Sequence, residues 1–356
     1  MAKIGNKHII ASVVAIVVIA AIIFTVFGTD TFAAKAQNNT IRADVIKDCS
    51  STPWIVGMQL GFFKNASINF VDVGSISEQN EPAALAAGQI NVFDGHPNTI
   101  INLLQAGVPV KAVAVGGSEP IVQNNTTVDE DHMHYEVLNT SQYQNISDVK
   151  AALANGTKIK VGTVATGTCV DLEFNNWLLE NGVNMSTIKN QVQYVVLVDP
   201  DQEQALKEGQ IDIASLHPPF YKEAETLGGI NTLVTSEQAF GPAAGMSLLV
   251  FTNQYIQEYP GTVRDFTNAY KDDERWVQNN REQAGNITAA FIGLPYTSNV
   301  HYYSESGAFD NTSIGYLQQW INAMVQQGDI PAGKYTPQDL YTTEFQDTWK
   351  PNLPDN

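Results

Sequence analysis

Two stretches of this chain, 121 residues apart, carry the same pattern of residues. Residues 84–97 read ALAAGQINVFDGHP and residues 205–218 read ALKEGQIDIASLHP, so Ala-Leu, Gly-Gln-Ile and His-Pro stand at matching positions. Each copy predicts the end of a helix, a glycine that permits a left-handed stop, a short apolar strand and a His-Pro turn. The repeat therefore predicts two units of similar design.

The segments upstream of the two copies also follow one plan. Residues 41–46 alternate like a strand, and a turn at 49–53 then leads into a helix. Residues 158–164 predict a second such strand, followed by a turn at 165–169 and a helix over 171–182. Strand alternating with helix is typical of parallel βαβ units, so the sequence predicts an α/β fold with two lobes.

The position of a ligand site follows from this fold class. In open α/β sheets the ligand binds beyond the carboxyl ends of the strands. These ends are four loops, two from each predicted lobe, at residues 49–54, 94–98, 163–169 and 215–220. Two such surfaces that face each other form a cleft, which closes around a small molecule by hinge motion.

Composition excludes several classes of protein. A chain of 356 residues with 44% hydrophobic content can bury the cores of two domains. Its 37 acidic and 19 basic side chains give a net charge of −18, which repels a nucleic-acid backbone. Two cysteines are too few for a disulfide scaffold or a Cys-rich zinc module. We expect a monomer with no nucleic-acid partner.

The N-terminal segment and the glycan acceptor sequences both indicate export. Lys3 and Lys7 precede an apolar run over 9–27, and residues 34–36 resemble a cleavage signal, so residues 1–37 are a signal peptide or a retained membrane anchor. Ten Asn-x-Ser/Thr sequences indicate a glycosylated surface, or an Asn-rich surface with unused acceptors. Their asparagines are Asn38, Asn65, Asn124, Asn125, Asn139, Asn145, Asn155, Asn184, Asn286 and Asn311.

The order of several motifs resembles a known family. The motifs are GFFK (61–64), INFVDV (68–73), both repeat copies with their flanks (84–114 and 208–225), KIKVGTVATGT (158–168), and two closing helices (259–280 and 316–331). Over about residues 40–350 this order is similar to that of the nitrate/sulfonate/taurine group of periplasmic-type binding proteins. Related binders of thiamine pyrimidine precursors share the architecture.

The resemblance implies both a fold and a function. The fold is the type II periplasmic-binding-protein fold, with lobe 1 at 38–120 plus 247–356, lobe 2 at 121–246 and two crossings between them. The function is an extracytoplasmic solute-binding protein that captures a small anion, such as a sulfonate, taurine or a nitrate-like solute, for an ABC permease, without a cofactor. Two alternatives stay open: a binder of an aminopyrimidine thiamine precursor, and a surface sensor or receptor without transport.

Catalysis is not expected from the motifs of this chain. Relatives that make the thiamine pyrimidine carry a Cys-rich iron motif, and this sequence has no such run. G-x-S-x-G, H-E-x-x-H, the P-loop and the dinucleotide fingerprint are absent as well. The sequence therefore predicts a binding protein rather than an enzyme.

Short hydroxyl side chains precede the first helix of each predicted lobe. Backbone N–H groups at helix starts form anion sites, although such residues are also ordinary helix caps. Asp94 and His96 are candidates for hydrogen bonds to a pyrimidine, and Trp54 and Phe220 for stacking. The candidate ligand-binding residues are Ser50, Ser51, Thr52, Trp54, Asp94, His96, Asn98, Thr163, Thr166, Gly167, Thr168, His217 and Phe220.

Two cysteines and two histidines occupy nearly matching positions in the two lobes. Cys49, His96, Cys169 and His217 are candidate ligands for Zn²⁺ or another thiophilic metal. Close ligand pairs are absent and each of these histidines precedes a proline, so shaping of the turn is an alternative role. The cysteines are expected as free thiols, with a disulfide between the lobes as the alternative. The acidic stretch 129–134 predicts an exposed insertion, with weak metal binding as an alternative.

The arginines argue against a guanidinium clamp on a sulfonate. Arg42 is the only arginine before position 264, and it lies at the start of the first strand, away from the carboxyl-end loops. Such a clamp would need Arg264, Arg275 or Arg281 to reach the cleft.

Overall fold

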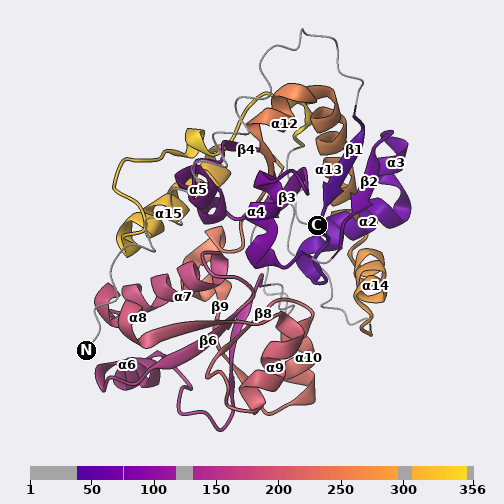
Figure 1. Cartoon of the computed structure of the whole chain (residues 1–356). Coiled ribbons are helices and arrows are strands. Elements are labelled where there is room, and N and C mark those ends of the chain that lie inside the picture. Colours follow the sequence, from indigo (N-terminus) through magenta and orange to yellow (C-terminus); the bar gives the residue numbers. More distant parts are fainter. Residues whose placement is uncertain (1–37, 75, 118–130, 296–306, 351–356) are drawn as a thin grey trace, which may run out of the picture. The chain divides into compact units, whose positions relative to one another are not determined.

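The computed structural model describes residues 38–74, 76–117, 131–295 and 307–350 (Figure 1). The predicted signal peptide or anchor at 1–37 lies outside these residues. Within the described residues, no helix is long and apolar enough to cross a membrane. Residues 39–356 form one unit, which contains both predicted lobes.

Within the described residues, five strands form the sheets of the first lobe. They are β1 (Thr40–Ala43), β2 (Asn69–Asp72), β3 (Val92–Gly95), β4 (Val110–Gly117) and β10 (Ser247–Thr252). β1 pairs in parallel with β2, whereas β10 lies antiparallel between β3 and β4. Asn91 links the two groups, because its backbone N–H donates to the Arg42 carbonyl at 2.8 Å and its side-chain oxygen accepts from the Arg42 N–H at 3.0 Å.

Five more strands, in the part of the second lobe that the structure describes, have the same order. They are β5 (His134–Leu138), β6 (Ile159–Thr163), β7 (Val192–Val196), β8 (Ala214–Leu216) and β9 (Ile230–Thr235). β6 pairs in parallel with β7, and β5 lies antiparallel between β8 and β9. Asp212 links the groups here, because its backbone N–H donates to the Lys160 carbonyl at 2.9 Å and its carboxylate accepts from the Lys160 N–H at 2.8 Å.

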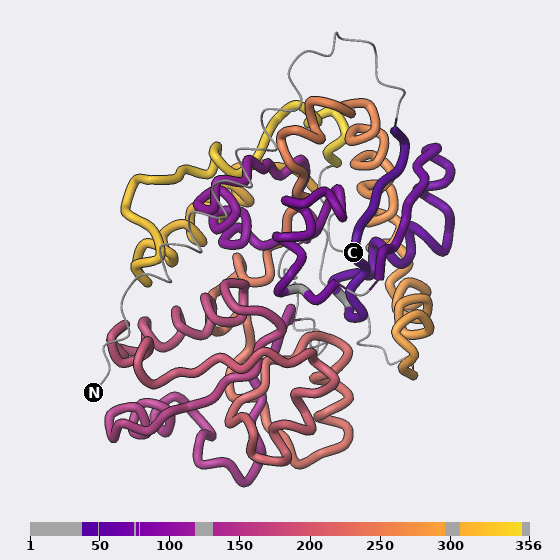
Figure 2. The backbone as a smooth tube through the Cα atoms, in the orientation of Figure 1, coloured from indigo at the N-terminus to yellow at the C-terminus, as the bar shows by residue number. Residues whose placement is uncertain are grey.

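The chain crosses between the lobes twice. β5 follows β4 in the sequence but pairs in the second lobe, and β10 follows β9 but pairs in the first. Figure 2 shows the orange segment that contains β10 among the purple segments of the first lobe. Both inserted strands run antiparallel to their neighbours. Each lobe therefore combines one parallel strand pair with antiparallel pairs, and the local βαβ pattern does not reveal the strand that arrives from far along the chain.

Helices cover the sheets of both lobes (Figure 1). Those before β5 or after β10 are α2 (Thr52–Leu60), α3 (Phe62–Asn65), α4 (Glu81–Ala86), α5 (Pro97–Gln105), α12 (Asn253–Glu258), α13 (Pro260–Asn279), α14 (Arg281–Ile292) and α15 (Asn311–Gln327). Those between β5 and β10 are α6 (Ile146–Ala154), α7 (Cys169–Glu180), α8 (Met185–Gln191), α9 (Asp199–Lys207), α10 (Phe220–Leu227) and α11 (Ser236–Phe240). The short 3₁₀ helices are Cys49–Ser51, Glu78–Asn80, Gly241–Ala243, Pro337–Asp339 and Gln346–Thr348.

Each copy of the repeat folds as its sequence predicts. Gly88 follows α4 and Gly209 follows α9, with φ of 70° and 68°, a left-handed conformation that glycine adopts without strain. β3 and β8 come next, and each is followed by a histidine. His96 is the N-cap of α5, and His217 comes shortly before α10. The matching histidines therefore lie at the carboxyl ends of equivalent strands.

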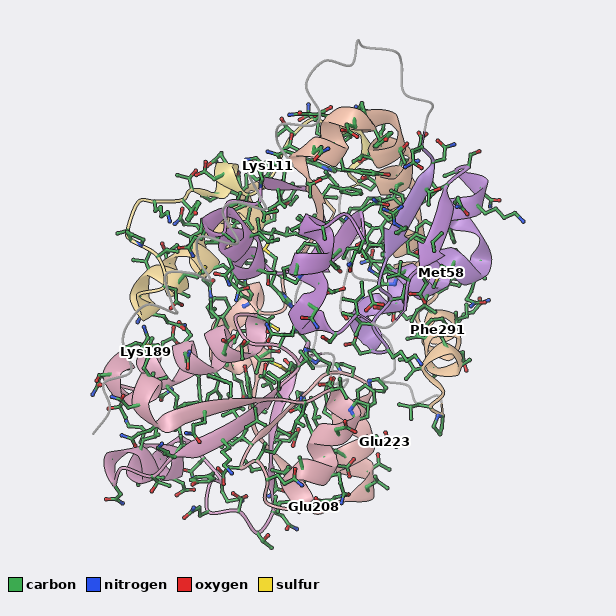
Figure 3. The ribbon with its side chains drawn as sticks, in the orientation of Figure 1. Met58, Lys111, Lys189, Glu208, Glu223 and Phe291 are labelled. Atoms are coloured by element: carbon green, nitrogen blue, oxygen red, sulfur yellow. The ribbon has the colours of Figure 1, made fainter. Side chains whose placement is uncertain are left out.

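An aromatic cluster holds α2 against α13 in the first lobe. The Trp54 ring lies 5.8 Å from the Phe266 ring and 5.2 Å from the Tyr270 ring, measured between centroids. Phe266 and Tyr270 are four residues apart and therefore share one face of α13. Figure 3 shows Met58 of α2 beside Phe291 of α14, and both side chains pack against the same core.

Candidate functional site

A cavity of about 400 Å³ is lined by residues of both lobes. The first lobe contributes residues that follow β1 and β3, together with one side of α4 and α5. The second lobe contributes the segment before β5 and the segments that follow β6 and β8. The carboxyl ends of four strands thus meet at one cavity, of a volume that suits a small molecule.

Nine of the thirteen residues predicted to bind a ligand line this cavity. They are Ser50, Ser51, Trp54, Asp94, His96, Thr166, Gly167, Thr168 and His217. Trp54 is only 3% exposed, because its ring packs in the aromatic cluster of α2 and α13. The indole is therefore held mainly by the core of the first lobe and presents little surface for stacking.

Three of the other predicted residues are buried in the lobes and do not line the cavity. The hydroxyl of Thr52 lies 3.0 Å from that of Thr288, which donates to it. The hydroxyl of Thr163 donates to the Ala165 carbonyl at 2.6 Å and so stabilises its own turn. Phe220 packs in the core of the second lobe. These side chains support the loops around the cavity.

Asn98, the fourth, joins the two lobes beside the cavity. Its side-chain N–H groups donate to the carbonyls of Gly167 and Thr168 at 3.0 and 2.7 Å. Nearby, the backbone N–H and the hydroxyl of Thr166 donate to the side-chain oxygen of Gln79 at 2.8 and 3.0 Å. These four hydrogen bonds, with a longer one of 3.3 Å from the Asn102 side chain to the Gly167 carbonyl, hold the second-lobe loop against the first lobe.

Hydrogen-bond donors at the predicted anion-binding loops are bonded to the chain itself. The backbone N–H of Gly167 donates to the Asp171 carboxylate at 2.8 Å. The backbone N–H of Ser50 donates to the Asp48 carboxylate at 2.8 Å, and the Ser50 hydroxyl donates to the same oxygen. An anion that used these donors would have to displace a carboxylate from each.

His96 and His217 approach the cavity with defined ring orientations. Nδ1 of His96 lies 2.9 Å from the Met246 carbonyl, and since a carbonyl only accepts, this nitrogen carries the proton. Burial lowers the pKa of His96 to about 4. Nδ1 of His217 lies 2.9 Å from the Asp199 carboxylate. Burial alone would lower the pKa of His217, but Asp199 and a hydrogen bond with Cys169 raise it well above 6.5.

His132 is a third histidine at the cavity, and the sequence analysis did not select it. Its ring centroid lies 5.7 Å from that of His96 and 4.9 Å from that of His217. One ligand atom each from His96, His132 and Cys169 lie within 4.8 Å of one another. Cys169 is a buried thiol, whereas the side chain of Cys49 lies outside the described part of the chain. The described cysteine and histidine side chains at the cavity are therefore Cys169, His96, His132 and His217. His132 was not among the predicted metal ligands.

The segment 129–134 was expected to be an exposed insertion, but the two histidines in it are buried. The exposed fraction is 1% for His132 and 2% for His134, which begins β5. Alternation of Met133, Tyr135 and Val137 with polar residues was the available signal for this strand. The neighbouring acidic residues and glycan acceptors masked it. Asp129 and Glu130 lie outside the described residues.

Buried carboxyl groups give the cavity an acidic lining. Asp94 accepts from the Ser247 hydroxyl at 3.1 Å, while its other oxygen has no hydrogen-bond partner among the described residues. Burial raises the pKa of Asp94 to about 7 and also raises that of Asp48. Close behind the lining, burial raises the pKa of Glu173 to about 8, although its carboxylate accepts from the Gly245 N–H.

Within the described residues, the cavity lining contains no lysine and no arginine. Arg42 donates instead to the backbone carbonyls of residues 88 and 89, as its place in the sequence indicated. Arg264 pairs with Asp347 at an exposed position. The other two arginines considered for a clamp, Arg275 and Arg281, do not line the cavity either. The guanidinium clamp on a sulfonate is therefore not formed.

Two α/β lobes with two crossings and a cavity between their strand ends define a type II periplasmic-binding-protein-like fold, as the sequence predicted. The model of the NMT1-like family matches residues 34–293. The chain belongs to this family. No curated protein matches the sequence.

Solved structures share the fold at low sequence identity. A ligand-binding component of an ABC-type import system from Staphylococcus aureus, solved with zinc bound, is 15% identical with a TM-score of 0.66, over 87% of this chain and 99% of that one. The alkanesulfonate-binding protein SsuA from Xanthomonas axonopodis, bound to MOPS, is 14% identical with a TM-score of 0.67, over 86% and 99%. The periplasmic nitrate-binding protein NrtA from Synechocystis is 13% identical with a TM-score of 0.70, over 87% and 88%.

The same fold also occurs in an enzyme. The desulfurization enzyme DSZB is 11% identical to this chain with a TM-score of 0.58, over 87% of this chain and 98% of that one. The fold alone therefore does not show whether a protein binds its ligand or converts it. That distinction depends on the residues of the cavity.

Proposed function

We propose that this protein is an extracytoplasmic solute-binding protein of an ABC importer, which captures a small solute in the cavity between its lobes. The cavity lined from both lobes carries the proposal, because closure on a ligand requires contacts from both sides. The names of the structural neighbours support the transport role. The partner is a membrane permease, and the lobes are residues 38–120 plus 247–356 and residues 121–246.

Export to this location is supported by the glycan acceptor sequences. Within the described residues, seven of the acceptor asparagines are exposed, namely Asn65, Asn139, Asn145, Asn155, Asn184, Asn286 and Asn311. A glycosylated surface requires this exposure. The N-terminal segment serves in this proposal as the export signal or the anchor.

The first candidate ligand is a small oxyanion such as a sulfonate, taurine or a nitrate-like ion. The names of SsuA and NrtA support this choice, and the cavity has a fitting volume. The hydroxyl groups of Ser51 and Thr168 line the cavity and provide hydrogen-bond donors. The acidic lining opposes an anion, so this ligand requires protonated carboxyl groups or a bound cation to offset the charge.

The second candidate ligand is an aminopyrimidine, and one observation favours it. The oxygen of Asp94 that has no partner in the described part of the chain is an acceptor for an exocyclic amino group. His96 lies beside it, with its Nδ1 proton directed at Met246 and Nε2 left as a second acceptor. A lining with these acceptors, and without lysine or arginine among the described residues, suits a ligand that donates hydrogen bonds.

We also infer that the protein binds its solute without chemical change. Cys169, His217 and Asp199 form a series of hydrogen bonds that resembles a nucleophile, a base and an orienting carboxylate. If this series acted in catalysis, incubation with a bound solute would yield a product detectable by mass spectrometry. Recovery of the intact solute is the expected result.

A thermal-shift screen tests the proposed function and separates the two ligands. The purified chain is mixed, in EDTA, with an alkanesulfonate, taurine, nitrate and an aminopyrimidine. A ligand that binds only the folded protein raises the unfolding midpoint. A83W is the test variant, because Ala83 lines the cavity and a tryptophan there takes up part of it, whereas A87W places the same ring just after α4, outside the lining.

The expected result is a midpoint shift from one ligand class in wild type and A87W, and no shift in A83W. Equal shifts in all three proteins would place binding outside the cavity and contradict the proposal. A response to the aminopyrimidine alone would select the second candidate.

A further inference from the structure

We propose that His96, His132 and Cys169 bind a thiophilic transition-metal ion such as Zn²⁺ in the cavity, with His217 as the fourth donor. Ligand atoms of the first three residues lie within 4.8 Å of one another. A tetrahedral zinc ion with bonds of about 2.0 Å to nitrogen and about 2.3 Å to sulfur holds its ligands roughly 3.3–3.8 Å apart. Small rotations of these side chains bring the donors to that spacing.

His217 completes the set by its position. Its ring centroid lies 4.9 Å from that of His132, and its side chain forms a hydrogen bond with Cys169. Since Nδ1 of His217 is bonded to Asp199, the nitrogen that faces Cys169 is Nε2. Three imidazoles and one thiolate make the four donors that zinc takes at closed sites.

Two of the histidines already have the outer partners that metal-binding imidazoles need. A ligating histidine usually donates its other ring N–H to a carboxylate or a backbone carbonyl, which fixes the tautomer. Nδ1 of His96 lies 2.9 Å from the Met246 carbonyl, and Nδ1 of His217 lies 2.9 Å from the Asp199 carboxylate. Both rings therefore direct Nε2 away from these partners and toward the cluster.

The surroundings favour a cation at this place. All four side chains line the cavity, so an ion that enters the cavity reaches them. Asp48 and Asp94 line the same cavity, and no lysine or arginine does so among the described residues. In their ionised form these two carboxyl groups attract a cation. Since His96 belongs to the first lobe and the other three donors to the second, the ion joins the lobes.

The donor types select the class of metal. A thiolate with imidazoles prefers Zn²⁺ or copper, whereas Ca²⁺ and Mg²⁺ require oxygen ligands. Binding releases the thiol proton of Cys169 and the proton on Nε2 of a charged His217, because the thiolate and the neutral imidazole are the forms that coordinate. The proposal stands on these side chains and does not depend on the transport role.

Cobalt spectroscopy on the full chain tests the site directly. The protein is reduced, stripped with EDTA, desalted and titrated with Co²⁺, and the affinity for Zn²⁺ is then measured by competition with a chromophoric chelator. We expect one ion per chain, the d–d bands of four-coordinate cobalt and a thiolate-to-cobalt charge-transfer band. C169S should remove the charge-transfer band, and H96Q and H132Q should each weaken Zn²⁺ binding at least about tenfold.

Two matched variants serve as controls. C49S removes the only other cysteine of the chain and should keep the charge-transfer band. H134Q changes the histidine two residues beyond His132, which lies in a separate group with Glu136 and Glu225, and should keep the affinity for Zn²⁺. Loss of the band in C49S alone, or loss of zinc binding in H134Q with retention in H96Q, would overturn the proposal. Absence of Co²⁺ and Zn²⁺ binding would overturn it as well.

Folding of each variant is checked by circular dichroism and by the unfolding midpoint without metal. If C169S does not fold, X-ray absorption at the zinc edge of the wild-type protein decides: one sulfur and several imidazoles around zinc support the site, and a shell without sulfur contradicts it. Solute binding in EDTA is measured on the same samples. Solute binding without metal binding would leave the proposed function standing and reject only the metal site.

Discussion

Asn91 in the first lobe and Asp212 in the second lobe form the same pair of hydrogen bonds to the neighbouring strand. Each donates its backbone N–H to a carbonyl and accepts the backbone N–H of the same residue with its side chain, at Arg42 and Lys160 respectively. The two residues occupy matching positions of the sequence repeat. The repeat therefore encodes the joint between the parallel strand pair and the strand that leads to the cavity.

Loss of this joint should destabilise the first lobe. N91A removes the acceptor of the Arg42 N–H, and an unsatisfied buried donor costs about 1–3 kcal/mol. The free energy of unfolding from urea titration should fall by that amount. Q89A is the control, because the exposed Gln89 side chain is not part of the joint. Equal effects of the two substitutions would contradict the assigned role of Asn91.

Hydrogen bonds between the lobes should favour the closed form. N98A removes the two bonds to the carbonyls of Gly167 and Thr168. At about 1 kcal/mol per bond, the apparent affinity for a cavity ligand should fall roughly thirtyfold. N102A removes one longer bond, of 3.3 Å, to Gly167 and should have a smaller effect. Isothermal titration of all three proteins measures this, and a larger loss in N102A than in N98A would refute the account.

The buried ion cluster of His134 predicts a stability maximum between weakly acidic and mildly alkaline pH. The charged groups that face His134 are Asp131, Glu136 and Glu225, with Tyr221 stacked on its ring. Burial alone would lower the pKa of His134, but its hydrogen bonds to these carboxylates raise it well above 6.5. The hydrogen bond from His134 lowers the pKa of Glu225 from 4.5 to about 2.

The signs of these shifts set the pH window. His134 contributes stability that is complete below its unfolded pKa of 6.5 and is lost as the pH rises through its raised folded pKa. Glu225 contributes stability above 4.5 that is lost as the pH falls toward about 2. H134Q should therefore flatten the pH dependence of the unfolding free energy on both sides. An unchanged pH profile in H134Q would show that the cluster does not act this way.

Trp54 should act through packing rather than through ligand stacking. W54A removes a buried ring from the contact with Phe266 and Tyr270 and should cost about 3–5 kcal/mol of unfolding free energy. W54F fills much of the space and should leave the ligand affinity within a factor of about three, a change of under 1 kcal/mol. Denaturant titration and calorimetry test both. A strong loss of affinity in a stable W54F protein would restore the stacking role.

Local patterns in the sequence explain most of the fold and part of the site. The repeat places His96 and His217 at equivalent strand ends, and both reach one cavity. The insertion of β5 and β10 into the sheets is a long-range pairing, which no local pattern reveals. The position of His132 at the cavity was missed for a related reason. The rings near it, those of His96 and His217, come from distant loops, whereas its neighbours in the sequence are acidic.

The roles of individual residues depend on contacts that the sequence does not contain. Thr52 and Thr163 have the right residue type at the right helix or strand end, but their hydroxyl groups face Thr288 and the Ala165 carbonyl. The backbone N–H of Gly167 donates to Asp171 of the helix that follows it, rather than to the cavity. These roles depend on side-chain rotamers and on close packing, and a pattern of residue types determines neither the rotamers nor the packing.

A crystal structure of the chain with the strongest ligand of the thermal-shift screen tests whether the cavity between the lobes is the solute site. We expect electron density for the ligand inside the cavity, in contact with Asp94 from the first lobe and with Thr168 or His217 from the second. Density at any other place on the protein, with the cavity side chains arranged as they are here, would contradict it.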